Sequence, residues 1–154
     1  MIDAAPPFVP AAFVVPLRLE TPAFVLEPLG PQHNEADYAA WTSSMTHIHG
    51  LPGFEGQKWP HEMSLEENRG ELEEHARDFE NRSGFTYTVL EPHDGDVIGC
   101  VYIYPARESA AHDASVVSWV RADRAALDEP LWCAVRDWLR QEWPFTNATY
   151  ASRT

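Results

Sequence analysis

Two apolar runs joined by a short turn constrain the fold of this chain most strongly. Residues 85–90 and 97–104 are rich in β-branched and aromatic side chains, which favour strands. The segment between them contains Asp94 and Gly95, a dipeptide typical of tight hairpin turns. This pattern predicts an antiparallel hairpin, and a similar run at residues 114–120 predicts a third neighbouring antiparallel strand.

Helical patterns lie on both sides of this hairpin. Asn34 is positioned to cap a first helix, and Ser64 with Glu67 forms a capping box for a second. The expected buried residues are Tyr38, Trp41 and Met45 in the first helix, Leu65, Leu72, Ala76 and Phe79 in the second, and Leu131, Val135, Trp138 and Leu139 in a last helix. Alternation of such helices with the strands predicts an α+β fold.

The remaining segments are less regular. Prolines in residues 1–12 predict an extended N-terminal arm, so that residues 13–154 form a single domain. One strand is expected at residues 23–29, and glycines and prolines make residues 47–62 a long loop with several aromatic side chains.

The chain is strongly acidic, with 11 Lys and Arg against 24 Asp and Glu and a formal net charge of −13. Such a charge repels polyanions and attracts cations, which argues against a nucleic-acid partner. No apolar run reaches the roughly 20 residues that a membrane helix needs, and the N-terminus lacks signal-peptide character. We expect a cytoplasmic protein without a membrane partner, and the spacing of its His and Cys residues predicts no metal site.

Local sequence and element order together resemble the GNAT superfamily of N-acetyltransferases over roughly residues 15–150. The resemblance is carried by residues 17–29, 97–102 and 117–121, and by an amphipathic helix that ends at residues 137–139. It implies a GNAT-like fold with a mainly antiparallel mixed sheet flanked by helices. That family usually adds a helix and two strands after its fifth strand, so the resemblance also implies that the C-terminal part is missing here.

The resemblance implies acetyl-CoA as the cofactor. In that family the strand at residues 115–120 bonds the pantetheine arm, and the next loop holds the pyrophosphate through a Gln/Arg-x-x-Gly-x-Gly/Ala pattern. The cofactor-binding residues would then be Trp119, Val120, Arg121 and Arg124.

The corresponding loop, residues 121–130, departs from that pattern because no glycine follows Gly99. Glycines let backbone N–H groups approach an anion closely. Asp128 is expected to cap the last helix with Glu129 in its first turn, and both carboxylates would repel a phosphate. Arg124 is an alternative ion-pair partner for Asp128. The phosphate loop is therefore degenerate, and we expect weak binding of acetyl-CoA.

No pair of a nucleophile and a general base can be identified from the sequence. Candidates for proton transfer are Glu62, Ser118 and Tyr150, each with a structural alternative as a solvated loop group, a sheet hydroxyl and a packed ring. Two functions stay open. The chain is either a divergent acyltransferase that moves an acyl group from a CoA thioester to a small-molecule or cationic amine, or a non-catalytic binding module that uses Trp41, Phe54 and Trp59.

Overall fold

The fold is built on one six-stranded sheet, seen in a computed structural model that describes residues 6–107 and 110–154. The strands follow one another in sequence order, and their bounds are Leu19–Glu20 (β1), Val25–Pro28 (β2), Phe85–Leu90 (β3), Val97–Tyr104 (β4), Ala114–Val120 (β5) and Ala148–Tyr150 (β6). Every neighbouring pair is antiparallel except β5 and β6, which are parallel. The sheet is therefore mixed and mainly antiparallel, as the family resemblance implies.

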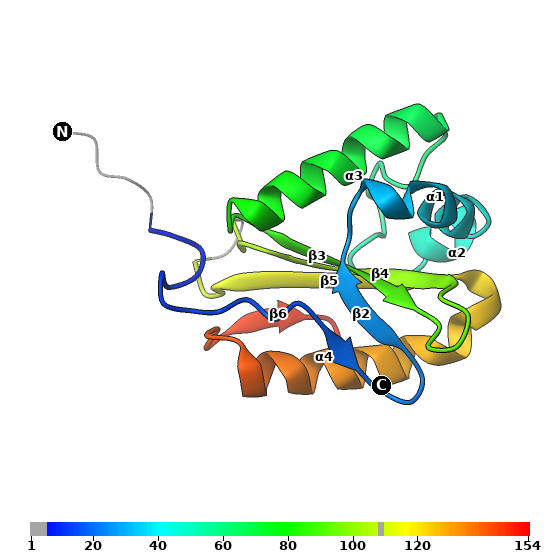
Figure 1. The fold of residues 1–154 in the computed structure, drawn as a ribbon. Helices are drawn as coiled ribbons and strands as arrows, with labels where there is room; N and C mark the ends of the chain where they lie inside the picture. Colours follow the sequence, from blue (N-terminus) through cyan, green and yellow to red (C-terminus); the bar gives the residue numbers. More distant parts are fainter. Residues whose placement is uncertain (1–5, 108–109) are drawn as a thin grey trace.

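Helices cover both faces of this sheet (Figure 1). Three helices lie on one face, namely α1 (Asn34–Thr42), α2 (Met45–His49) and α3 (Leu65–Glu80), and α4 (Asp128–Glu142) lies on the other. Two short 3-10 segments, Pro31–His33 (η1) and Ala122–Leu127 (η2), lead directly into α1 and α4. Among the described residues, no helix is both long and apolar enough to span a bilayer.

The predicted hairpin of β3 and β4 is confirmed, and β5 pairs with the other edge of β4. Gly99 lies opposite Val120, where a Cβ atom on Gly99 would come within 2.0 Å of the Trp119 carbonyl oxygen. Only a residue without a side chain allows this approach. β4 and β5 are therefore held close together in one register.

Two apolar cores lie on the two faces of the sheet. The larger core, next to α4, includes all four residues predicted for the inner side of that helix: Leu131, Val135, Trp138 and Leu139. The second core lies under α1–α3 and contains Trp41, Ile48, Leu72 and Trp119. The phenol of Tyr87 belongs to the larger core, where it donates a hydrogen bond to the Pro16 carbonyl oxygen at 2.7 Å.

The capping box of α3 is confirmed, but its predicted buried stripe is partly wrong. Ser64 Oγ accepts from the Glu67 N–H at 3.0 Å, and Glu67 Oε1 accepts from the Ser64 N–H at 3.0 Å. Leu65 is 42% exposed, whereas Asn68 is 2% exposed. The inward stripe of α3 is set by Asn68, which is buried because its amide bonds polar groups of α1.

Two further expectations need correction near α1. Asn34 is the first residue of α1 rather than its cap, because its side chain donates to the Leu65 carbonyl and accepts from Asn68. The predicted loop at residues 47–62 begins inside a helix, α2, and turns without further helix or strand follow from residue 50 to residue 64.

The segment before β1 contacts the larger core. Val9 is buried, and the ring of Phe8 stacks on those of Phe85 and Phe145 with centroid distances of 5.8 and 5.1 Å. The division of the chain at residue 12 stays a prediction.

We predict opposite effects for two glycine substitutions. Gly99→Ala forces β4 away from β5 and lowers the free energy of unfolding by at least about 2 kcal/mol. Gly70→Ala, in α3, meets no atom within 4 Å and raises it by up to about 1 kcal/mol, because alanine favours helix. Urea unfolding of both variants checks this, and equal effects would contradict the close approach at Gly99.

Candidate functional site

The parallel strands β5 and β6 separate halfway along β5. Their last paired residues are Val116 and Tyr150, while β5 continues to Val120. The backbone of residues 117–120 therefore faces a space that no strand of the described chain occupies on the β6 side.

The side chain of Arg153 occupies that space. Its Nη2 donates to the Ser118 carbonyl oxygen at 2.9 Å, and its Nε donates to Asp128 Oδ2 at 2.7 Å. The Arg153 side chain is only 5% exposed and that of Asp128 15% exposed. The second oxygen of Asp128 is buried without a hydrogen-bond partner among the described residues. A buried ion pair thus fills the gap between the separating strands and the start of α4.

The predicted cap at Asp128 is wrong for the same reason. The residue before α4 is Leu127, which continues from η2, and its side chain makes no cap. The Asp128 carboxylate binds Arg153 instead, and the Asp128 N–H donates to the Ala125 carbonyl oxygen within the 3-10 segment.

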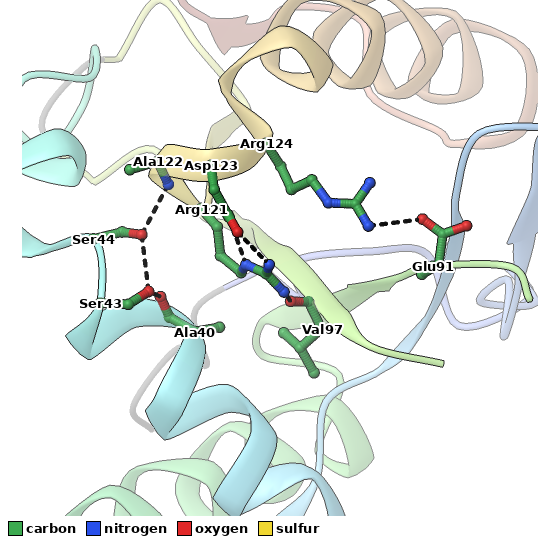
Figure 2. A network of polar contacts seen from close by, with 9 residues as sticks. All are labelled: Ala40, Ser43, Ser44, Glu91, Val97, Arg121, Ala122, Asp123 and Arg124. Atoms are coloured by element: carbon green, nitrogen blue, oxygen red, sulfur yellow. Dashed lines mark hydrogen bonds and ion pairs between the residues drawn. The ribbon is translucent and has the colours of Figure 1, made fainter. Parts of the chain in front are cut away.

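Backbone N–H groups of the loop after β5 are already hydrogen-bonded within the chain, and Figure 2 shows the contact made by Ala122. The Ala122 N–H donates to Ser44 Oγ at 2.8 Å, which ties the loop to the start of α2. The Arg121 and Arg124 N–H groups donate to the carbonyl oxygens of Ile98 and Arg121. A bound anion would have to replace these contacts at the three N–H groups.

The two arginines of this loop are also paired within the chain. The Arg121 guanidinium donates to both oxygens of Asp123, at 2.9 and 2.7 Å, and to the Val97 carbonyl oxygen at 3.1 Å. Arg124 donates to Glu91 at 3.1 Å (Figure 2), so it is not the partner of Asp128 that the sequence suggested. Of the other predicted cofactor residues, Trp119 and Val120 are fully buried.

The predicted catalytic candidates divide into a contacting pair and a separate residue. Ser118 Oγ and the Tyr150 hydroxyl lie 2.6 Å apart, on neighbouring strands. Burial raises the pKa of Tyr150 to about 12, so its hydroxyl keeps its proton at neutral pH. Glu62 is exposed, outside the cavity described below.

A partly open cavity of about 310 Å³ lies between α1, α3 and the sheet. Its apolar walls include Phe54, Trp59, Tyr102 and Val117, and its polar side chains are Asp37, Asn68, Glu71 and His75. The Trp59 ring lies between the rings of Trp41, at 5.5 Å, and Trp119, at 6.2 Å. Sizes from about 300 Å³, with a few convergent polar groups, are typical of small-molecule sites.

Asp37 is the charged group that this cavity encloses most completely, at 4% exposure. Its Oδ2 accepts from the Asn68 amide at 3.1 Å, while the Asn68 oxygen accepts from the Trp41 indole at 3.1 Å. Its Oδ1 has no hydrogen-bond partner within the described residues. Burial raises the pKa of Asp37 to about 6, against the opposing effects of the Asn68 hydrogen bond and His33.

Comparison with solved structures shows that several acetyltransferases have a similar fold. The ribosomal-protein-S5-alanine acetyltransferase from Vibrio fischeri matches with a TM-score of 0.61 at 13% identity, over 80% of this chain and 67% of that one. The microcin C7 self-immunity acetyltransferase MccE, solved with acetyl-CoA and AMP, matches with a TM-score of 0.58 at 14% identity, over 77% of this chain and 62% of that one.

A third match is the ribosomal L7/L12 α-N-protein acetyltransferase RimL in complex with coenzyme A, with a TM-score of 0.54 and 12% identity over 82% of this chain and 67% of that one. This chain has the GNAT acetyltransferase fold. No protein-family model and no curated protein matches its sequence.

The structure brings together polar residues of two helices that the sequence analysis did not assign to a common site. Asn34 and Asp37 in α1, and Asn68 and His75 in α3, are spaced by three and seven residues, which puts each pair on one helix side. In the sequence, the signal for the cavity was the presence of polar residues at helical positions that face the protein interior. Arg153 carried no such signal, because its partners lie 25 and 35 residues earlier in the chain.

We predict that the Arg153–Asp128 pair is important for stability. Arg153→Ala leaves Asp128 buried without a cation and lowers the free energy of unfolding by about 3 kcal/mol. The control Arg69→Ala, which removes an exposed pair with Glu73, changes it by less than about 0.5 kcal/mol. Equal changes in denaturant unfolding would contradict a buried pair.

Asp37 gives a prediction for the dependence of stability on pH. Its folded pKa, raised from 3.8 to about 6, means that the folded state holds a proton that the unfolded state releases, so stability falls as the pH rises through this window. The loss is about 3 kcal/mol above pH 6 and absent below pH 4.

The isosteric variant Asp37→Asn removes this penalty. We expect it to match the parent near pH 4 and to be more stable than the parent by up to about 3 kcal/mol at pH 7. Urea unfolding of both proteins across this range measures the difference, and a difference that does not grow with pH would contradict a raised pKa at Asp37.

Proposed function

We propose that this chain is a GNAT-fold binding module that takes a small amine with an apolar body into the cavity under α1 and α3. The observation that carries the proposal is a carboxylate, Asp37, enclosed among aromatic rings with one oxygen directed to no protein donor. A buried carboxylate is costly unless a cation or donors accompany it. An ammonium group supplies both.

The walls of the cavity and the charge of the chain support the same ligand class. Aromatic faces attract cations, and Trp59, Phe54 and Tyr102 pack around one another at centroid distances of 5.8 to 6.5 Å. The exposed Glu71 adds a second carboxylate to the lining. The net charge of −13 raises the local concentration of cations and lowers that of anions.

Acetyl-CoA binding has weaker support. The cofactor would need the Ser118 carbonyl region and the N–H groups before α4, and these already bind Arg153, Ser44 and the 3-10 backbone. Asp123 and Asp128 are already paired with Arg121 and Arg153, and Glu129 adds a further carboxylate in the first turn of α4. A phosphate charge about 4 Å from an unpaired carboxylate meets roughly 4 kcal/mol of repulsion at an effective dielectric near 20.

Acyl transfer from a CoA thioester to the amine is the second candidate. It is favoured by one observation besides the fold: Val117, the first residue of β5 beyond the last pair with β6, also lines the cavity. A thioester placed where the strands separate would lie near an amine held by Asp37. On this reading Arg153 has to leave its position before the cofactor enters.

Calorimetry with benzylamine tests the first proposal, with benzoate as an anion of similar shape. We expect benzylamine to bind the parent at pH 7, Asp37→Asn to weaken this binding at least tenfold, and benzoate not to bind. The tenfold loss corresponds to about 1.4 kcal/mol, a modest value for a charge-assisted hydrogen bond. Equal affinities of the parent and Asp37→Asn for benzylamine would refute the role of Asp37.

Titration with acetyl-CoA separates the two candidates. The binding-module proposal predicts a dissociation constant no better than about 100 μM for the parent, equivalent to roughly 5.5 kcal/mol. If Arg153 only blocks an intact cofactor site, Arg153→Ala binds acetyl-CoA measurably better than the parent at a temperature where it stays folded. Low-micromolar binding of acetyl-CoA by the parent would favour acyl transfer over the binding-module proposal.

A further inference from the structure

A chain of hydrogen bonds extends from the surface of α3 to the cavity. The Tyr104 hydroxyl in β4 donates to Asp78 Oδ2 at 2.8 Å. The same hydroxyl oxygen lies 2.9 Å from Nδ1 of His75, and Thr86 Oγ1 lies 3.2 Å from that nitrogen. The His75 side chain lines the cavity, so these hydrogen bonds connect Asp78 to the amine site proposed above.

The available protons in this series of hydrogen bonds indicate which ring nitrogen of His75 is protonated. A phenol has one proton, and Tyr104 gives it to the Asp78 carboxylate, which can only accept. The Tyr104 oxygen is then an acceptor for His75, and Thr86 Oγ1 can accept from the same nitrogen, so these contacts favour a proton on Nδ1 of His75. A neutral imidazole protonated at Nδ1 has its lone pair at Nε2.

We propose that Asp78 and Tyr104 position His75 in the Nδ1–H tautomer, which makes Nε2 a hydrogen-bond acceptor for the ligand in the cavity. Nε2 has no hydrogen-bond partner among residues 6–107 and 110–154. The cavity then offers acceptors from two helices, Asp37 on α1 and both His75 and Glu71 on α3. It selects a ligand that donates hydrogen bonds and disfavours one that only accepts. The ligand part of this inference rests on the proposed function.

Burial supports a neutral ring at neutral pH. Desolvation lowers the pKa of His75, and this effect exceeds the opposing attraction of Glu71, Asp78 and Glu74 on α3. The ring also packs against Tyr102 and Tyr104 of β4, with centroid distances of 5.6 and 6.1 Å. Burial raises the pKa of both phenols, so the groups that face the ring from the sheet are uncharged.

Nuclear magnetic resonance of 15N-histidine protein, without ligand at pH 7.5, tests the tautomer directly. We expect a protonated, pyrrole-type signal for Nδ1 of His75 and an unprotonated, pyridine-type signal for Nε2, both assigned by their loss in His75→Gln. In Tyr104→Phe the nearer oxygen acceptor is lost, and the Thr86 hydroxyl, 3.2 Å from Nδ1, is free to donate its proton to that nitrogen, so the Nε2–H form should gain population. Tyr87→Phe, which removes a buried hydroxyl that bonds the Pro16 carbonyl, should leave the signals unchanged.

Nε2–H as the main tautomer in the parent, or an unchanged tautomer in Tyr104→Phe, would overturn the proposal. Benzylamine calorimetry on the same proteins then tests the consequence for binding. We expect Tyr104→Phe to weaken benzylamine about three- to tenfold, as for loss of one oriented hydrogen bond, and Tyr87→Phe to have no effect. Equal weakening in both variants would overturn the positioning role.

The proposed amine ligand and the proposed role of Tyr104 can be refuted independently. If the parent shows the Nδ1–H tautomer and Tyr104→Phe changes it, but benzylamine does not bind, the positioning by Tyr104 stands and the proposed amine ligand is wrong. If benzylamine binds through Asp37 while the tautomer is Nε2–H, the proposed function stands and the role of Tyr104 is wrong.

Discussion

The structure depends on the close pairing of β4 with β5. Because Gly99 has no side chain, these strands approach closely and hold one register over six residue pairs, from Gly99–Val120 to Tyr104–Ser115. This register places Tyr102 and Val117 together on the side of α1–α3, where they form the sheet wall of the cavity. It also leaves the other edge of β5 facing β6, where the two strands separate.

The free edge of β5 and its helical face therefore differ in what surrounds them. On its free edge, Arg153 and Asp128 fill the space beside Ser118, and the loop up to α4 binds Ser44 and its own backbone. On the helical face, aromatic rings line a partly open cavity that contains a carboxylate whose burial costs stability. Natural proteins keep such costly groups mainly where function needs them. This contrast favours the cavity as the functional part of the molecule.

The sequence predicted the elements whose signals are local. The hairpin, the β5 strand, the Ser64 capping box and the buried side of α4 follow from alternation, turn residues and helical spacing, and all are confirmed. Asn34 and Asp128 look like caps in sequence, but each side chain bonds a distant partner, Asn68 or Arg153. The cavity needs contacts between α1 and α3 more than thirty residues apart, and no local pattern specifies those.

The pKa of Asp37 links the cavity, its charge and its ligand in one quantity. Carbon-13 NMR of the Asp37 carboxyl, followed over pH with and without saturating benzylamine, measures it directly. The account predicts a pKa of about 6 for the free protein and a value well below that when an ammonium group lies beside the carboxylate. A pKa that is the same with and without the amine would contradict the central claim that this cavity binds a cation at Asp37.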